Sequence, residues 1–155
     1  MRQSDGSPSV WIPADSTGVM DRYAAIISRV KKQYGVRVRR WRSNMTGCAW
    51  QVRYRDGRVV RWVEAPYPKS PISLCIFLHE VGHHVIGFEA YKHRCEEEYH
   101  AWHWAIVRMR ELGVEPDARV LRRFDLSMRY AVDKALRRGI KRLPETLTPF
   151  VPKAA

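Results

Sequence analysis

Apolar residues recur along the chain with two different spacings, and the change between them separates helices from strands. From Val19 to Tyr34 they mark one helical face, and Gly35 stands where a helix of this length ends. From residue 36 they alternate with polar residues, which predicts strands over 36–42, 50–54 and 59–63. An Asp-Gly turn at 56–57 joins the last two, so the pattern predicts a small antiparallel β-meander.

Helical spacing returns after a proline-rich link at residues 66–71. Ser70 and Pro71 predict the start of a helix that runs to about Ile86 and is apolar nearly all round, as in a helix buried within a domain. Two more helices are expected over about 94–112 and 117–138. We therefore expect an α+β fold. Its parts are an irregular N-terminal arm over 1–16, a single domain over 17–143 and an extended C-terminal tail over 144–155.

The composition suits one folded domain. Hydrophobic residues make up 45% of the 155 residues, which is enough for a core. No apolar run approaches the roughly 18 residues of a membrane span, and the first residues lack the apolar stretch of a signal peptide. The three cysteines are odd in number and lack a metal-binding spacing, which is typical of reduced thiols. The sequence therefore predicts a cytoplasmic protein without a membrane partner.

The chain is strongly basic, with 28 Lys and Arg against 16 Asp and Glu and a net charge of +12. Such a surplus attracts nucleic acid and other polyanions. Arginines concentrate in the segment Arg37–Arg42 and in the last predicted helix. One candidate function is therefore a basic nucleic-acid-binding or regulatory protein with a structural or vestigial zinc site. A merely solvated basic surface explains the charge equally well.

The central helix contains His79-Glu80-Val81-Gly82-His83. Histidines four residues apart lie on one helical face, so both imidazoles can reach a single metal ion. Glu80 lies about 100° around the axis and can face a water molecule at that ion. In a chain with six His and nine Glu, this pattern arises by chance with a frequency of roughly 0.01–0.02. The structural alternative is two hydrogen-bonded core histidines, with Glu80 paired to an arginine.

A catalytic zinc ion takes three protein ligands and keeps one position open. Three consecutive acids, Glu96-Glu97-Glu98, open the next helix, and at helical spacing only one of them can point straight into the core. Glu98 shares a face with Ala101 and Trp102 and is the first candidate for the third ligand. Glu97 is the second candidate, followed by Glu96 or a histidine.

Two segments resemble the ImmA/IrrE-type small zinc metallopeptidases, which belong to the gluzincin group and are frequent in phages and mobile elements. The first is PISLCIFLHEVGHH at 71–84, and the second, Glu98–Ala105, fits the pattern Glu-x-x-Ala-x-x-aromatic-Ala. The likeness covers about residues 18–112. It implies a minimal gluzincin-like fold in which His79, His83 and Glu98 bind Zn²⁺ and Glu80 is the general base.

The resemblance leaves two roles in the site unassigned. Some gluzincins carry an acidic residue four positions after the ligand glutamate, where it orients the first zinc histidine, and this chain has Trp102 there. The group that stabilises the oxyanion is also unassigned. Its candidates are His100, His103, Tyr91 and Tyr130.

The motifs together predict a zinc-dependent metallopeptidase that hydrolyses peptide bonds by metal-activated water. Its substrate would be a protein or peptide, such as a repressor or another regulatory protein. The strand over about 58–64, nearest the catalytic helix, is expected to pair with an extended substrate along its edge. The basic surface leaves room for nucleic acid as a second partner.

Overall fold

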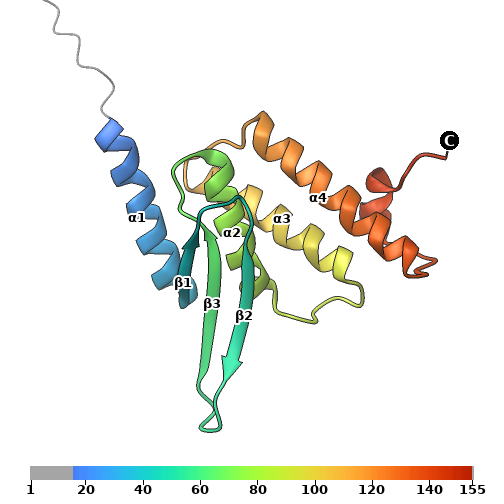
Figure 1. Ribbon diagram of the computed structural model, residues 1–155, viewed down its shortest axis with the longest axis horizontal. Coiled ribbons are helices and arrows are strands. Elements are labelled where there is room, and N and C mark those ends of the chain that lie inside the picture. Colours follow the sequence, from blue (N-terminus) through green and yellow to red (C-terminus); the bar gives the residue numbers. More distant parts are fainter. Residues whose placement is uncertain (1–15, 155) are drawn as a thin grey trace, which may run out of the picture.

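The computed structural model describes residues 16–154, which form five helices and a three-stranded sheet (Figure 1). The elements in chain order are α1 (Ser16–Tyr34), β1 (Val36–Arg42), β2 (Cys48–Arg53), β3 (Val59–Pro66), α2 (Pro71–Ile86), α3 (Arg94–Glu111), α4 (Ala118–Arg137) and the 3₁₀ helix η1 (Glu145–Phe150). The predicted α+β class is confirmed. The N-terminal arm expected over 1–16 lies outside the described residues, except for Ser16, which begins α1.

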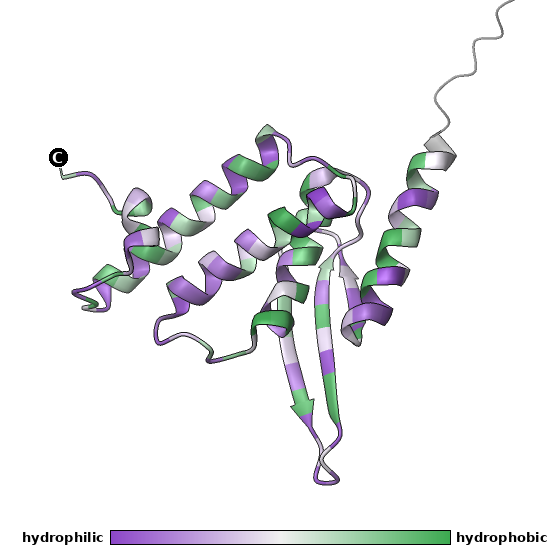
Figure 2. Ribbon diagram, turned by 180° about the vertical axis from the view of Figure 1, so that it is seen from behind, coloured by the Kyte–Doolittle hydropathy of each residue, from purple (hydrophilic) through white to green (hydrophobic). Residues whose placement is uncertain are grey.

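α2 lies between the sheet and the remaining C-terminal helices. It packs on β3 on one side and on α3 on the other, α4 packs on α3, and α1 runs beside β1 (Figure 1). Every residue from Ile72 to His83 is buried, which explains why α2 is apolar nearly all round. By contrast, hydrophilic and hydrophobic turns alternate along α1 and α4 (Figure 2). None of the described helices is long and apolar enough to cross a membrane.

The start of α2 is fixed by the residues that the sequence indicated. The Ser70 side chain accepts a hydrogen bond from the backbone N–H of Ser73, and the Ser73 hydroxyl accepts one from the N–H of Ser70. Pro71 occupies the first helical position, where no donor is needed. This capping box sets the rotation of α2 and so the direction in which His79 and His83 point.

The sheet is mixed, and the predicted antiparallel meander is wrong in its strand order. The order is β1-β3-β2, with β3 parallel to β1 and antiparallel to β2. β3 contains the most buried stretch of the sheet, from Val63 to Pro66, and therefore takes the central place under α2. The arginine-rich β1 lies at an edge, where its long side chains reach solvent. Alternation indicates which face a residue takes but not which strand lies beside it.

The central place of β3 also overturns the expectation that a substrate pairs along residues 58–64. Both edges of β3 are hydrogen-bonded to neighbouring strands, so β3 offers no groups to a further strand. Among the described residues, β2 pairs only with β3 and keeps one edge unpaired. An added strand would therefore have to pair with β2 or β1.

The β1 arginines gather around one carboxylate of β3. Arg42 Nε donates to Glu64 Oε2 at 3.0 Å, Arg40 Nη2 lies 3.4 Å from the same oxygen, and Arg39 Nη1 lies 3.8 Å from Oε1. The hydrogen bond from Arg42 and the positive charges hold the pKa of Glu64 below its ordinary value. Three of the four arginines in 37–42 are thus engaged within the fold.

The C-terminal tail, expected to be extended over 144–155, instead forms η1 and joins the core. Leu147 and Phe150 are buried, and the Phe150 ring packs edge-on against Phe124 of α4 with 5.6 Å between ring centroids. Leu147 and Phe150 are three residues apart, which places them on one side of the 3₁₀ helix. The prolines at 144, 149 and 152 favour an extended chain, but the burial of Leu147 and Phe150 in the core outweighs this preference.

The Glu64 cluster predicts a pH-dependent difference between the wild type and Glu64→Gln. Because the folded-state pKa is lowered, the carboxylate contributes stability above its ordinary pKa, and this contribution is lost as the pH falls through the lowered value. Urea unfolding should show Glu64→Gln to be less stable at pH 7, and the difference should be smaller at an acidic pH well below the ordinary pKa of glutamate. Glu115→Gln, at an exposed ion pair, is the control and should change little at either pH. A Glu64→Gln deficit of equal size at both pH values would contradict the assignment.

Candidate metal centre

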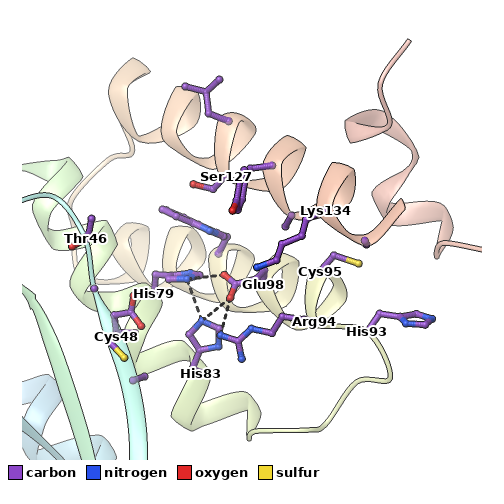
Figure 3. Close-up of a pocket in the computed structure, with 18 of the residues that line it drawn as sticks. Thr46, Cys48, His79, His83, His93, Arg94, Cys95, Glu98, Ser127 and Lys134 are labelled. Atoms are coloured by element: carbon purple, nitrogen blue, oxygen red, sulfur yellow. Dashed lines mark hydrogen bonds and ion pairs between the residues drawn. The ribbon is translucent and has the colours of Figure 1, made fainter. Parts of the chain in front are cut away.

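Three side chains from two helices converge where α2 packs on α3. His79 Nε2 lies 3.2 Å from His83 Nε2 and 3.1 Å from Glu98 Oε2, and His83 Nε2 lies 3.5 Å from Glu98 Oε1 (Figure 3). One donor atom from each residue lies within 4.8 Å of the others, so the group could hold a metal ion. These are the two histidines and the first-ranked glutamate that the sequence indicated.

The spacing of the donor atoms fits a tetrahedral metal ion. Ligand atoms at roughly 2.0–2.1 Å from a zinc ion stand roughly 3.3 Å apart along each edge of the tetrahedron. The two imidazole nitrogens stand 3.2 Å apart, and each lies close to that value from one oxygen of the Glu98 carboxylate, His79 from Oε2 and His83 from Oε1. Two imidazole nitrogens and a carboxylate oxygen are also a donor set that suits zinc. Both the geometry and the chemistry of the residues therefore fit a zinc ion.

Glu97 holds the second ring nitrogen of His83. Nδ1–H of His83 donates to Glu97 Oε1 at 3.0 Å, and both side chains are buried. This contact fixes the tautomer that presents Nε2 to the metal site. Glu97, the second candidate for the third ligand, thus orients a ligand in this structure and does not join the group itself.

His79 is held differently. Its ring lies against Trp102 with 4.3 Å between centroids, and its buried Nδ1 has no hydrogen-bond partner among the described residues. Trp102 occupies the place where some gluzincins have an acid. An aromatic plane therefore sets the orientation of this imidazole where a carboxylate would otherwise do so.

The charges in the group are mutually dependent. Burial opposes ionisation of Glu98, but hydrogen bonds from His79 and His83 keep its pKa below the ordinary value. Burial lowers the pKa of His79. Burial also acts to lower the pKa of His83, but the hydrogen bond to Glu98 and the negative charge of Glu98 outweigh it, so the pKa of His83 is raised. Arg94 adds a positive charge from the rim, 2.8 Å from Glu97 and 3.0 Å from Glu98. A buried carboxylate here needs positive charge around it.

Glu80 lies beside the group on α2 and has no ion pair among the described residues, contrary to the structural alternative for the motif. It is buried, and this desolvation raises the pKa of its carboxyl to about 7. The backbone of Gly47 packs directly on it, since a Cβ at Gly47 would lie 2.6 Å from Glu80 Cγ and 2.8 Å from Cδ. The loop before β2 thus forms a wall that confines the Glu80 carboxylate.

A second close contact brings the two helices together. A Cβ at Gly82 of α2 would lie 3.0 Å from the carbonyl oxygen of Ala101 and 3.1 Å from the Trp104 ring, both on α3. A side chain at this position would push the two helices apart by a few tenths of an ångström or more. The close approach places Glu97 and Glu98, one turn earlier on α3, within reach of the histidines.

The group opens into a cavity of about 880 Å³, a volume typical of ligand sites. Its lining comes from the loop before β2, from α2, from α3 with the preceding loop, and from α4. Of the four residues considered for oxyanion stabilisation, Tyr130 lines the cavity, whereas Tyr91, His100 and His103 do not. Figure 3 shows Thr46 and Cys48 on one side of the metal group and Ser127 and Lys134 on the α4 side.

Two residues of the site escaped the sequence interpretation. Gly47 stands in a polar loop far from the motif, and no sequence signal places it against Glu80. Glu97 was considered only as a ligand. Glu97 is turned by about 100° from Glu98 around the helix axis and is the more buried of the two. This rotation brings its carboxylate to Nδ1 of His83.

Searches with this chain gave no match to a protein-family model, a curated protein or a solved structure. The resemblance to a peptidase family therefore rests on the two motifs and stays a prediction.

The three consecutive glutamates provide a matched series for zinc binding. Glu98→Gln removes a donor and should cause the largest loss of affinity. Glu97→Gln leaves the donors in place but weakens the support of His83, and should reduce affinity about 10–100-fold. Glu96→Gln touches neither and should stay close to the wild type. Competition for zinc against a chromophoric chelator measures all three, and wild-type affinity in Glu97→Gln would refute its orienting role.

Gly47→Ala tests the wall behind Glu80. The added Cβ has no room, so the Glu80 carboxylate should shift while the three donor atoms stay in place, with a loss of stability of about 1–3 kcal/mol. A crystal structure and denaturant unfolding check both effects. Gly18→Ala is the control because nothing lies within 4 Å of its added Cβ. An unmoved Glu80 with unchanged stability would show that the contact is not restrictive.

Proposed function

We propose that this protein is a zinc-dependent metallopeptidase. The observation that carries the proposal is a buried carboxylate, Glu80, in the same cavity as two imidazoles and a second carboxylate whose donor atoms lie within 4.8 Å of one another. This cavity is large enough for several residues of a polypeptide. A purely structural zinc site has four protein ligands and no adjoining cavity, whereas this group supplies three donors.

His79, His83 and Glu98 are the residues that would hold the metal. A zinc ion bound there supplies Lewis acidity, which polarises the scissile carbonyl and lowers the pKa of a water molecule. Glu97 keeps Nε2 of His83 directed at the site through its hydrogen bond to Nδ1. Trp102 keeps the His79 ring in its plane through the stacking contact.

Glu80 is the general base in this proposal. Its carboxylate takes a proton from the attacking water and later gives that proton to the amine that leaves the scissile bond. Burial raises the pKa of this carboxyl, which makes it a better proton acceptor than an exposed glutamate. Gly47 keeps the carboxylate from turning away from the cavity.

The substrate would lie as an extended chain along β2. Cys48 and Ala49 at the start of this strand line the cavity, and the edge of β2 that faces away from β3 is unpaired among the described residues. Backbone hydrogen bonds to such an edge hold a peptide in a defined register. This places the scissile bond between β2 and the metal group.

The alternative function, a basic nucleic-acid-binding or regulatory protein, finds less support. Three arginines of 37–42 are bound to Glu64, and Arg129 and Arg137 of α4 pair with Asp125 and Asp133. The overall charge favours contact with a polyanion, and a regulatory protein bound to DNA remains a substrate consistent with both features. We place the reaction in the cytoplasm, because all three cysteines are free.

Glu80→Gln separates metal binding from catalysis. The substitution keeps the volume of the side chain and leaves the three donors intact, so zinc content should equal that of the wild type. Peptide hydrolysis should fall by about 10²–10⁴-fold or more because the proton acceptor is lost. Elemental analysis and mass spectrometry of a digested peptide mixture measure the two effects.

Glu96→Gln serves as the control in the same assays and should cleave like the wild type. Full hydrolysis by Glu80→Gln would overturn the role of the base. Zinc-loaded wild-type protein that cleaves no peptide in the mixture would overturn the peptidase proposal.

A further inference from the structure

The wall of the cavity opposite β2 is made by one face of α4. Arg123, Leu126, Tyr130, Lys134 and Arg138 line the cavity from this helix, at the three- and four-residue spacing of a single face. The buried residues of α4, such as Val120, Met128 and Val132, lie on another face and pack in the core. α4 therefore contributes a continuous strip of surface to the same cavity that contains the metal group.

Positive charge is concentrated in this cavity. Five lining residues are Lys or Arg and two are Glu, and both glutamates belong to the metal centre. Arg94 is bound to Glu97 and Glu98. The other four cations form no ion pair with any described residue; they are Lys92, Arg123, Lys134 and Arg138. A cavity lined by one sign of charge attracts a ligand of the opposite sign.

Two other arginines of α4 pair with acids on the same helix. Arg129 Nε lies 2.9 Å from Asp125, and Arg137 Nε lies 3.0 Å from Asp133, each within a turn of the same helix. Lys134 contacts the Tyr130 ring, with Nζ 6.0 Å from its centroid, and reaches from α4 toward the metal group in Figure 3. Its charge is thus directed to the place that a substrate would occupy.

The same face also carries exposed apolar groups. Leu126 is 53% exposed and Tyr130 64% exposed, and they are four residues apart beside the cations. Large apolar side chains exposed next to unpaired cations indicate an occupant with both apolar and acidic groups. A polypeptide segment with Asp or Glu next to an apolar residue has this chemistry.

We propose that the α4 face formed by Arg123, Leu126, Tyr130, Lys134 and Arg138 selects acidic polypeptide segments as substrates of the metal centre. The inference rests on the proposed peptidase function and specifies its substrate class. A peptide fits better than nucleic acid, because Leu126 and Tyr130 offer exposed apolar surface beside the cations, which an apolar side chain next to Asp or Glu can cover and a phosphate backbone cannot.

The test compares two pools of short fluorescein-labelled peptides on the zinc-loaded full chain. The pools are randomised at all positions except two, which are Glu in one pool and Gln in the other. Fluorescence anisotropy measures binding, and mass spectrometry measures cleavage of the same pools. The Glu pool should bind about tenfold more tightly, and its advantage should decrease as salt is raised.

Charge-matched variants locate the effect. Lys134→Gln combined with Arg138→Gln should reduce the preference for the Glu pool to about twofold or less. Arg119→Gln combined with Arg122→Gln removes the same charge from exposed positions of α4 outside this cavity, and should keep the preference. Equal binding of the two pools, absence of binding to either, or equal effects of the two double variants would overturn the inference.

Two further outcomes separate this inference from the proposed function. A binding preference without cleavage of either pool would uphold acidic recognition and overturn the peptidase. Cleavage of both pools at equal rates with equal binding would support the peptidase and overturn acidic recognition. A single-stranded oligonucleotide that displaces the Glu pool at lower concentration than unlabelled Glu peptide would assign the face to nucleic acid and overturn the inference.

Discussion

Helices α2 and α3 touch at Gly82, where a Cβ would lie 3.0 Å from the carbonyl oxygen of Ala101. The rest of the centre depends on this approach. The close backbones allow the histidines of α2 to lie within 3.1–3.5 Å of Glu98 on α3. Helices with side chains between them usually pack 8–10 Å apart. A larger residue at position 82 would separate the donors while leaving every one of them in the sequence.

Polar groups at a buried helix contact need partners, and here the partners form a connected set. Glu97 receives a hydrogen bond from His83 and an ion pair from Arg94, and Glu98 lies against both histidines and the same arginine. The apolar core around α2 excludes water from the back of the centre, so the charges are screened only on the cavity side. The fold thereby leaves one approach to the centre, bordered by β2 and α4.

The sequence predicted the parts of this arrangement that depend on local spacing. The caps of α2, the position of His79 and His83 on one face and the reach of Glu98 to both histidines follow from helical periodicity. The expectation that Glu98 is the most inward of the three glutamates is wrong, because Glu97 is buried and Glu98 is partly exposed. The order of the strands does not follow from local spacing, since β3 enters between β1 and β2 through contacts distant in sequence. Gly47 was missed for the same reason: its importance comes from Glu80, which lies 33 residues later. The tail differs from the extended chain that its prolines predict, because Leu147 and Phe150 are buried on one side of η1.

The two imidazoles of the centre are chemically unequal. His83 donates its outer N–H to a carboxylate, which makes its inner nitrogen more electron-rich, whereas His79 rests on an indole and receives no such polarisation. A metal ion bound by this pair would have a stronger bond to His83 and a weaker bond to His79. Of the two histidines, His83 would therefore contribute more to the affinity of the centre for a metal ion.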